Sequence, residues 1–149
     1  MKFILATLMF LLLVLPANSQ ELSLVGHGFS YHTTNSSQYN QDNYGAAVRL
    51  QNANLAVQLG TYRNSYNQTA NYLVLDLNLL SSSIAEFVQL EMGPMLAVVT
   101  GYPGHSVLAG PGMQAALRYN DFYIRTRIMP ALSTPAVAAL ELGYVLYRF

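Results

Sequence analysis

The sequence predicts an all-β fold, an eight-stranded antiparallel transmembrane β-barrel with short periplasmic turns and longer extracellular loops. Three observations support this prediction. The chain is 52% hydrophobic and only 9% charged, against about 25% charged residues in ordinary soluble domains. After residue 19, no apolar stretch approaches the roughly 20 residues that a spanning helix requires. Apolar and polar residues alternate instead as in strands, and only a closed barrel leaves no strand edge unpaired in lipid.

The first 19 residues are typical of a secretory signal peptide. Lys2 is followed by the apolar run "ILATLMFLLLVL", and small residues stand at Ala17 and Ser19. These small residues suit signal peptidase, and the apolar run is too short for a stop-transfer helix. A helical anchor is the alternative. We therefore expect residues 20–149 to form one outer-membrane barrel domain.

Charge and cysteine content exclude several classes of site. Without Lys2, the only lysine, six arginines face seven Asp and Glu residues, a formal charge of 6 − 7 = −1. This balance provides no basic patch for nucleic acid. The absence of cysteine excludes a disulfide framework and thiolate metal sites. His and carboxylate residues are too few and too scattered for a metal site, so we expect neither metal nor cofactor.

Turn residues and alternation place the strands in order. They are expected near residues 22–33, 44–52, 54–63, 70–80, 85–99, 106–119, 121–130 and 137–149. The first two flank a polar segment, and the second ends at the tight turn "LQNAN". In the third, Leu55, Val57 and Leu59 share one face. In the fourth, alternate leucines face lipid. The residues expected to face inward from the fourth strand are Asn71, Tyr72, Val74, Asp76 and Asn78.

The remaining strands differ in character. The strands at 85–99 and 106–119 carry Val, Leu, Met, Ala and Gly on both faces. This predicts an interior that is dry in at least one half, either as plain core packing or as a slot for a hydrocarbon chain. After the tight turn "RYND", Arg125 and Arg127 face inward, because a charge on the lipid face costs roughly 2 to 4 kcal/mol at midplane. The chain ends at Phe149, and such a terminal aromatic resembles the signal that barrel-assembly machinery reads.

Longer polar segments alternate with the tight turns along the chain. They are at 34–43, 64–70, 100–106 and 131–136. Long loops at one end and short turns at the other are typical of outer-membrane barrels, in which the long loops lie outside the cell. We therefore expect the bacterial outer membrane as the location of this protein.

Two short motifs stand at the predicted loops. His32 is followed by "YNQDNYG" at 39–45, and "GTYRNSYN" lies at 60–67. Further on, "AGPGMQAALRYNDFYIRTRIMP" places one proline in each of two neighbouring strands. Together these segments resemble the phospholipid:lipid A palmitoyltransferase family of the Gram-negative outer membrane. The resemblance covers nearly the whole chain after the predicted signal peptide, at low identity.

The resemblance implies an enzyme that moves a palmitoyl chain from the sn-1 position of a phospholipid to lipid A at the external face. The histidine and serine of the family match His32 and Ser65 in this chain, and its aspartate falls on Asn64. Two prolines of the family match Pro111 and Pro130 in this chain. In the family these prolines lack the N–H group of a strand residue, which loosens the barrel wall and lets lipid enter from the side. The implied substrates are phospholipid and lipid A. We also expect the protein to be a monomer, and its last strand to be recognised by barrel-assembly machinery.

The chemistry can also be argued from the residues themselves. Acyl transfer needs a base or nucleophile, a proton shuttle and donors for the developing oxyanion. His32 and Ser65 end separate strands at loop mouths, so they could meet at the rim of the barrel. Imidazole ordinarily titrates near pH 6.5, which suits a base at neutral pH. Asn64 would orient the imidazole less strongly than Asp, because an amide carries no charge.

Departures from the family favour a second hypothesis. Asn64 replaces the aspartate, and Asn43 stands where the family has a proline beside a second wall gap. Only "QELS" precedes the first strand, so the family's amphipathic helix is not expected. A lone loop histidine and an Asn-Ser turn are also common without catalysis. The alternative is a catalytically silent barrel with a structural, protective or adhesive role. A lipocalin-like periplasmic carrier is a third possibility.

Overall fold

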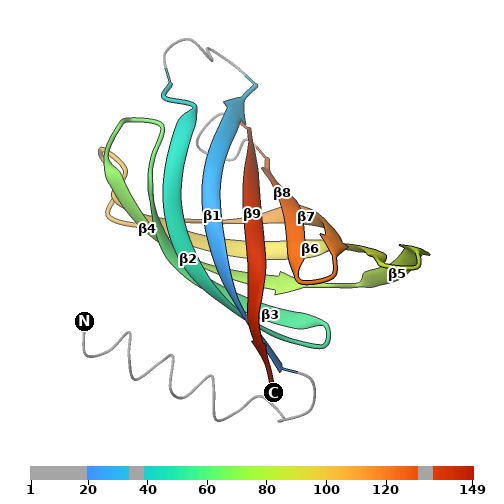
Figure 1. Ribbon diagram of the computed structural model, residues 1–149. Coiled ribbons are helices and arrows are strands. Elements are labelled where there is room, and N and C mark those ends of the chain that lie inside the picture. Colours follow the sequence, from blue (N-terminus) through green and yellow to red (C-terminus); the bar gives the residue numbers. More distant parts are fainter. Residues whose placement is uncertain (1–19, 34–38, 131–135) are drawn as a thin grey trace.

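A computed structural model of the chain describes residues 20–33, 39–130 and 136–149. The predicted signal peptide lies outside the described residues, as do parts of the predicted loops at 34–43 and 131–136. Among the described residues, no helix is long and apolar enough to cross a membrane. The strands are β1 (Gln20–His32), β2 (Asp42–Asn52), β3 (Leu55–Arg63), β4 (Thr69–Leu77), β5 (Leu80–Ala85), β6 (Val88–Thr100), β7 (Leu108–Tyr119), β8 (Phe122–Met129) and β9 (Val137–Arg148) (Figure 1).

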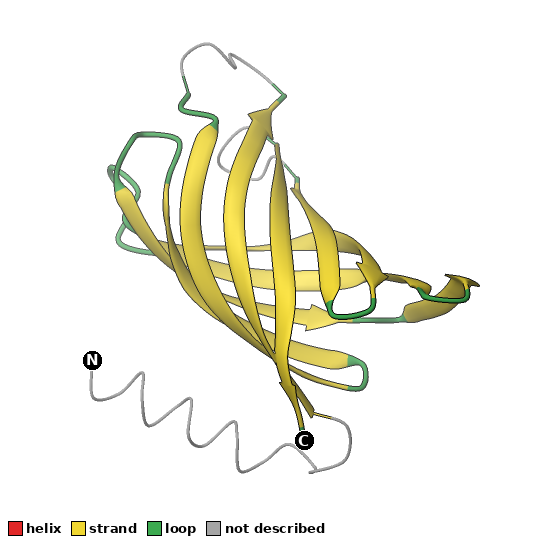
Figure 2. Ribbon diagram, in the orientation of Figure 1, coloured by secondary structure: helices red, strands yellow, loops and turns green. Residues whose placement is uncertain are grey.

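The strands close into a barrel by antiparallel pairing throughout. β1 pairs with both β2 and β9, and β4 pairs with β6, so the sheet returns on itself. β4 and β5 are two lengths of one strand, because both pair with β6. The closed eight-stranded antiparallel barrel predicted from the sequence is therefore confirmed (Figure 2). We call the end of the barrel where β1 leads to β2 the loop end, and the end where β2 leads to β3 the turn end.

A bulge separates β4 from β5. β4 pairs with β6 as far as Asp76↔Met95, and pairing resumes in β5 at Leu80↔Met92. Between these pairs the β4–β5 side has one residue more than β6. A Cβ atom on Gly93 would lie only 1.8 Å from the Leu77 carbonyl oxygen, so the close approach requires glycine. β5 and the start of β6 then project beyond the barrel as a hairpin (Figure 1). The prediction that the fourth strand ends near residue 80 was wrong, because the strand continues as β5 to Ala85. The serines at 81–83 show no alternation of apolar and polar residues, so the sequence does not mark this continuation.

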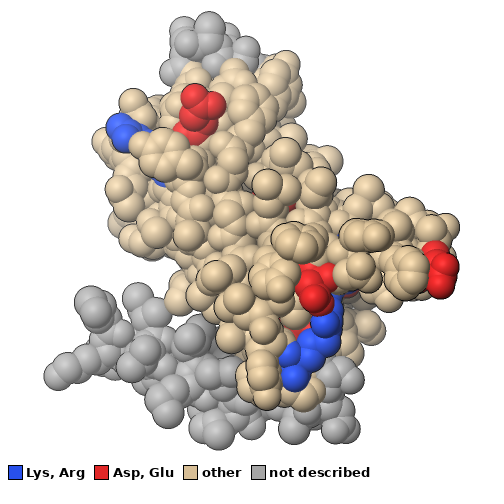
Figure 3. Space-filling model, in the orientation of Figure 1, with Lys and Arg blue, Asp and Glu red and all other residues tan. Residues whose placement is uncertain are grey.

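Side chains alternate between an apolar outside and a mixed inside. Exposed apolar residues on the outer face include Leu24, Val48, Leu75, Leu96, Leu117, Ile124, Ile128 and Leu142. The alternation predicted for 121–130 is confirmed, with Arg125 and Arg127 buried inside. Asn71 is exposed, contrary to prediction, because it shares the outward face with Leu73 and Leu75. On the face seen in Figure 3, charged residues lie at the upper left, near the bottom and at the tip of the projecting hairpin, and most of the surface between them is uncharged.

The interior has two layers of opposite character. Toward the turn end, the largest fully buried side chains are polar, among them Arg49, Gln58, Asp76, Gln114, Arg125 and Glu141. Toward the loop end, a hydrophobic cluster includes Val25, Ala47, Val74, Met95, Ala97 and Val99. The interior is thus apolar in one half, as predicted, and the apolar half is the one nearest the loops.

Candidate active site

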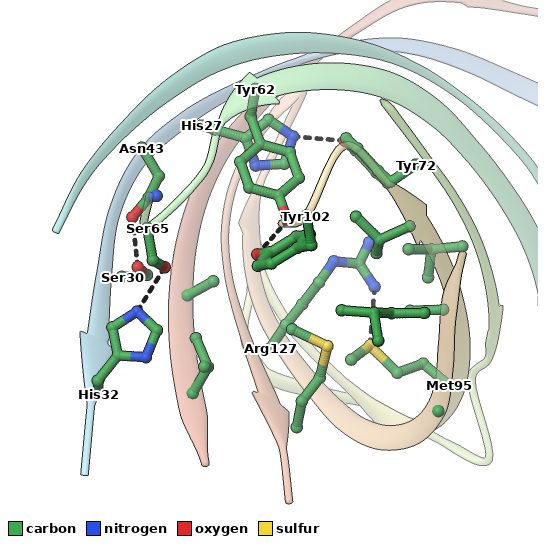
Figure 4. A pocket seen from close by; sticks show the side chains of 18 of the residues that line it. His27, Ser30, His32, Asn43, Tyr62, Ser65, Tyr72, Met95, Tyr102 and Arg127 are labelled. Atoms are coloured by element: carbon green, nitrogen blue, oxygen red, sulfur yellow. Dashed lines mark hydrogen bonds between the residues drawn. The ribbon is translucent and has the colours of Figure 1, made fainter. Parts of the chain in front are cut away.

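The predicted pair of His32 and Ser65 meets at the loop end. His32 is the last residue of β1, and Ser65 lies in the turn between β3 and β4. The Nε2 atom of His32 is 2.6 Å from the Ser65 Oγ atom, and both side chains are buried (Figure 4). Two residues 33 positions apart in sequence therefore form one hydrogen-bonded unit.

Neighbouring segments fix both members of this pair. The backbone of His32 pairs with Val137 of β9, and the Tyr39 ring stacks on the imidazole with centroids 4.5 Å apart. The Asn40 backbone N–H donates to the Ser65 carbonyl oxygen at 2.8 Å. The motif that follows His32 in sequence thus returns to hold Ser65 in place.

The Asn64 side chain is bound to the backbone of the turn that carries Ser65. Its Oδ1 atom accepts hydrogen bonds from the backbone N–H groups of Tyr66 and Gln68, both at 3.0 Å. Its Nδ2 atom donates to the Gly101 carbonyl oxygen at 2.8 Å. The amide is occupied by the backbone of its own turn and by the β6–β7 loop, so the orienting role expected for Asn64 stays a prediction. Asn64 positions Ser65 rather than contacting His32.

The electrostatic setting favours a neutral imidazole. His32 stands at the rim, where β1 ends, and burial lowers the pKa of its imidazole. Its Nδ1 atom has no hydrogen-bond partner among the described residues. Tyr102 lines the same cavity as Ser65, its hydroxyl lies 3.0 Å from the Tyr62 hydroxyl, and burial raises the pKa of the Tyr102 phenol. A neutral imidazole can accept a proton from Ser65, and a protonated phenol can donate a hydrogen bond nearby.

An apolar cavity of about 150 Å³ extends from the His32–Ser65 pair into the barrel. Its wall includes Met95, Ala97, Val99, Leu108 and Met129. These five side chains carry no oxygen or nitrogen atom, whereas polar side chains such as Ser30, Tyr102 and Arg127 line other parts of the cavity. The cavity therefore suits a hydrocarbon group more than a polar one.

A charged network forms the floor of the cavity. Arg127 donates to the Glu141 Oε1 atom at 2.9 Å and to the Gln58 Oε1 atom at 2.8 Å, and it also pairs with Asp76. His27 contacts the Tyr72 hydroxyl at this level. Sequence reasoning placed Arg127 inside but did not assign Gln58, His27 or Glu141 to a site. Among the described residues, no group of three or more His, Asp or Glu side chains is placed to hold a metal ion.

The barrel wall is interrupted between β7 and β8. Among the residues that the structure describes, their pairing ends at Met113↔Ile128, and β7 from Leu108 to Gly112 pairs with β6 alone. Pro111 lies in this unpaired length, and Pro130 directly follows β8. Both prolines line the cavity, so the cavity reaches the wall at the interruption. We call this interruption the β7–β8 gap.

The wall between β2 and β3, where the resemblance would place a second gap, is closed by side chains. Backbone pairing ends at Gly45↔Tyr62. Beyond this pair, the Asn43 Nδ2 atom donates to the Arg63 carbonyl oxygen at 2.7 Å, and Arg63 donates to the Tyr44 hydroxyl at 2.7 Å. Asn43 therefore seals a seam that a proline would leave open.

Comparisons with known proteins bear on the fold alone. No protein-family model matches the chain, and no curated protein sequence matches it. The crystal structure of Ail, the attachment invasion locus protein of Yersinia pestis, aligns with a TM-score of 0.48 and 16% identity, covering 88% of this chain and 98% of that one. Membership of the palmitoyltransferase family stays a prediction from the motifs.

Proposed function

We propose that this chain is an outer-membrane acyltransferase that moves an acyl chain from a phospholipid to lipid A. The observation that carries the proposal is one apolar cavity that joins the His32–Ser65 pair to the β7–β8 gap. A hydrolase of soluble esters would need no sideways opening toward lipid. A structural barrel would need neither the buried pair nor the cavity.

The outer surface supports a place in the outer membrane. Apolar side chains face outward on all sides of the barrel, and the inward charges are buried, which is the pattern of membrane barrels. β9 ends close to Phe149, whose N–H donates to the Gln20 carbonyl oxygen at 2.9 Å. We infer that this last strand, with its terminal aromatic, is the segment read by barrel-assembly machinery.

The proposed reaction has two acyl-transfer steps, and in each of them His32 takes up one proton and gives it back. The acyl chain enters through the β7–β8 gap and lies in the cavity, with its ester at Ser65. The Ser65 oxygen attacks the ester carbonyl carbon while His32 takes the hydroxyl proton, and the Tyr102 phenol is the candidate donor to the oxyanion. His32 returns the proton to the departing lysophospholipid. A lipid A hydroxyl then attacks the acyl-serine and gives its proton to His32, which passes it to the departing Ser65 oxygen.

The direct test measures acyl transfer from labelled phosphatidylcholine to lipid A by the refolded barrel. We expect His32→Gln and Ser65→Ala each to lower the rate by about 10²- to 10⁴-fold, the usual contribution of a base or nucleophile. Ser83→Ala, on the exposed hairpin, is the matched control and should leave transfer unchanged. Transfer at the wild-type rate in both site variants would refute the proposal.

A silent barrel with a structural, protective or adhesive role is the second candidate. The observation in its favour is that His32 Nδ1 has no partner among the described residues, since catalytic histidines are normally oriented through this atom. Mass spectrometry of lipid A from cells that express the chain separates the two candidates. An added acyl chain excludes the silent barrel, whereas unchanged lipid A beside a folded, surface-exposed barrel supports it.

A further inference from the structure

Three tyrosines form successive walls at right angles at the mouth of the cavity. The Tyr39 and Tyr66 rings lie 5.6 Å apart between centroids, at 89°, and the Tyr66 and Tyr102 rings lie 5.9 Å apart, at 84°. All three line the same cavity as the His32–Ser65 pair. We call this arrangement the tyrosine box.

The tyrosine box is open to a ligand rather than packed away. The Tyr66 side chain is 46% exposed, and Tyr39 and Tyr102 are only half-buried. The box also adjoins the reactive pair, because Tyr39 stacks on His32 and Tyr66 follows Ser65 in the same turn. A group held in the box would therefore lie beside Ser65.

The charge around the box restricts what that group can be. The cavity is lined by two charged residues, Arg127 and Glu141, and both belong to the network at its floor. Electron-rich aromatic faces without a carboxylate favour a weakly hydrated cation, and quaternary ammonium groups are the usual ligands of such aromatic boxes. A primary ammonium is more strongly hydrated and is better served by carboxylates or water.

We propose that the tyrosine box binds a trimethylammonium group, the headgroup cation of a choline-bearing phospholipid. This inference deepens the proposed function, because it names phosphatidylcholine as the favoured acyl donor. The headgroup would rest between Tyr39, Tyr66 and Tyr102 while the acyl chain occupies the cavity below. Binding itself requires no catalysis, so it can be measured separately.

The experiment uses full-length, refolded Ser65→Ala protein in a non-ionic detergent, which removes turnover. The chain contains eleven tyrosines, so fluorescence would not report on the box alone, and binding is measured by calorimetry instead. Short-chain phosphatidylcholine, phosphatidylethanolamine and phosphatidylglycerol with identical acyl chains are titrated in turn. We expect phosphatidylcholine to bind about tenfold more tightly than the other two, within the range of cation–π contributions. Equal binding of the three lipids would overturn the proposal.

Matched variants separate the aromatic faces from simple bulk. Tyr66→Phe keeps a ring and should retain the preference for choline, whereas Tyr66→Leu should abolish it. Tyr44→Leu removes an exposed tyrosine that does not line the cavity and should change nothing. A choline preference that survives Tyr66→Leu combined with Tyr102→Leu would also overturn the proposal.

Soluble phosphocholine tests whether the trimethylammonium group binds as a free headgroup or only as part of a whole lipid. Competition that depends on Tyr66 means that the free headgroup suffices, and absence of competition alongside tight phosphatidylcholine binding means that the whole lipid is required. Both results support the box. Choline-selective binding by Ser65→Ala, with no acyl transfer by the wild type, would refute the proposed enzyme and keep the box. Acyl transfer by the wild type, with no headgroup preference in binding, would refute the box and keep the proposed enzyme.

Discussion

At the scale of single residues, the site combines a predicted contact with an unpredicted one. His32 and Ser65 were expected to meet because both stand at strand ends next to loops, and they do. The direction of the Asn64 side chain could not be predicted, because it is set by the Gly101 carbonyl, 37 residues away on another loop. Hydrogen bonds between distant loops depend on the closed barrel and leave no local pattern in the sequence.

The first prediction concerns restoration of the family's aspartate by Asn64→Asp. We expect this change to lower the free energy of unfolding by about 1–3 kcal/mol, because a carboxylate would face the Gly101 carbonyl oxygen in place of a donor. It should not raise acyl transfer, since the side chain hydrogen-bonds backbone groups rather than His32. Denaturant titration of the barrel in lipid vesicles measures the first effect, and the transfer assay measures the second.

A control for this prediction lies in the same turn. Asn67 is exposed and has a φ of 65°, a conformation that Asp also tolerates. Asn67→Asp should therefore leave stability unchanged. If Asn64→Asp were as stable as the wild type and more active, the role assigned to Asn64 would be wrong.

At the scale of elements, the strands were largely predictable and the breaks between them were not. A two-residue period with one buried face fixes a strand and its register, so the boundaries of β2, β3, β7 and β8 lie within a few residues of prediction. The bulge before β5 depends on Gly93 of the opposite strand and was missed. The β7–β8 gap could be anticipated only through the two prolines, because proline donates no ladder hydrogen bond.

The second prediction tests the β7–β8 gap as the entry for lipid. The chain has no cysteine, so Pro111→Cys with Pro130→Cys can be linked by oxidation or a short thiol crosslinker without side reactions. Closure should lower acyl transfer by about tenfold or more, equivalent to about 1.4 kcal/mol, and reduction of the disulfide should restore it. The rate is measured on the same sample before and after reduction.

A matched pair of cysteines lies in the paired part of the same two strands. Ala115 and Thr126 are register partners below the gap. A link between Ala115→Cys and Thr126→Cys should leave the rate unaltered. Full activity of the linked Pro111–Pro130 variant would rule out this route of entry.

At the scale of the whole molecule, the barrel is divided across its axis. The loop-end half holds the cavity, and ion pairs and amides fill the layer below it. A separate polar recess, lined by Glu21, Asn54 and Arg118 among others, lies at the turn end. Alternation predicts which residues face inward, but not their partners. Gln58 donates to Glu141 across 83 residues of sequence, at 3.1 Å. Such pairings follow from the order and tilt of the strands around the barrel, which a single sequence does not specify.

The third prediction concerns the stability of this filled layer. Arg127→Met should lower the free energy of unfolding by about 3–5 kcal/mol, because it leaves Asp76 and Glu141 buried without their shared cation. Arg148→Met is the control, since that side chain is 52% exposed, and its loss should cost less than about 1 kcal/mol. Guanidinium unfolding in vesicles compares the two variants. Equal, small losses would show that the network contributes little.

The filled layer also has an electrical consequence. Fully buried side chains, including Arg49, Gln58, Asp76, Arg125 and Glu141, occupy the lumen below the cavity, and we expect them to block the flow of water between the two ends of the barrel. With the proposed opening to lipid through the wall, the barrel would still not act as a pore. At the proposed location, a cell could hold many copies of this protein without making its outer membrane leaky to ions or small toxic solutes.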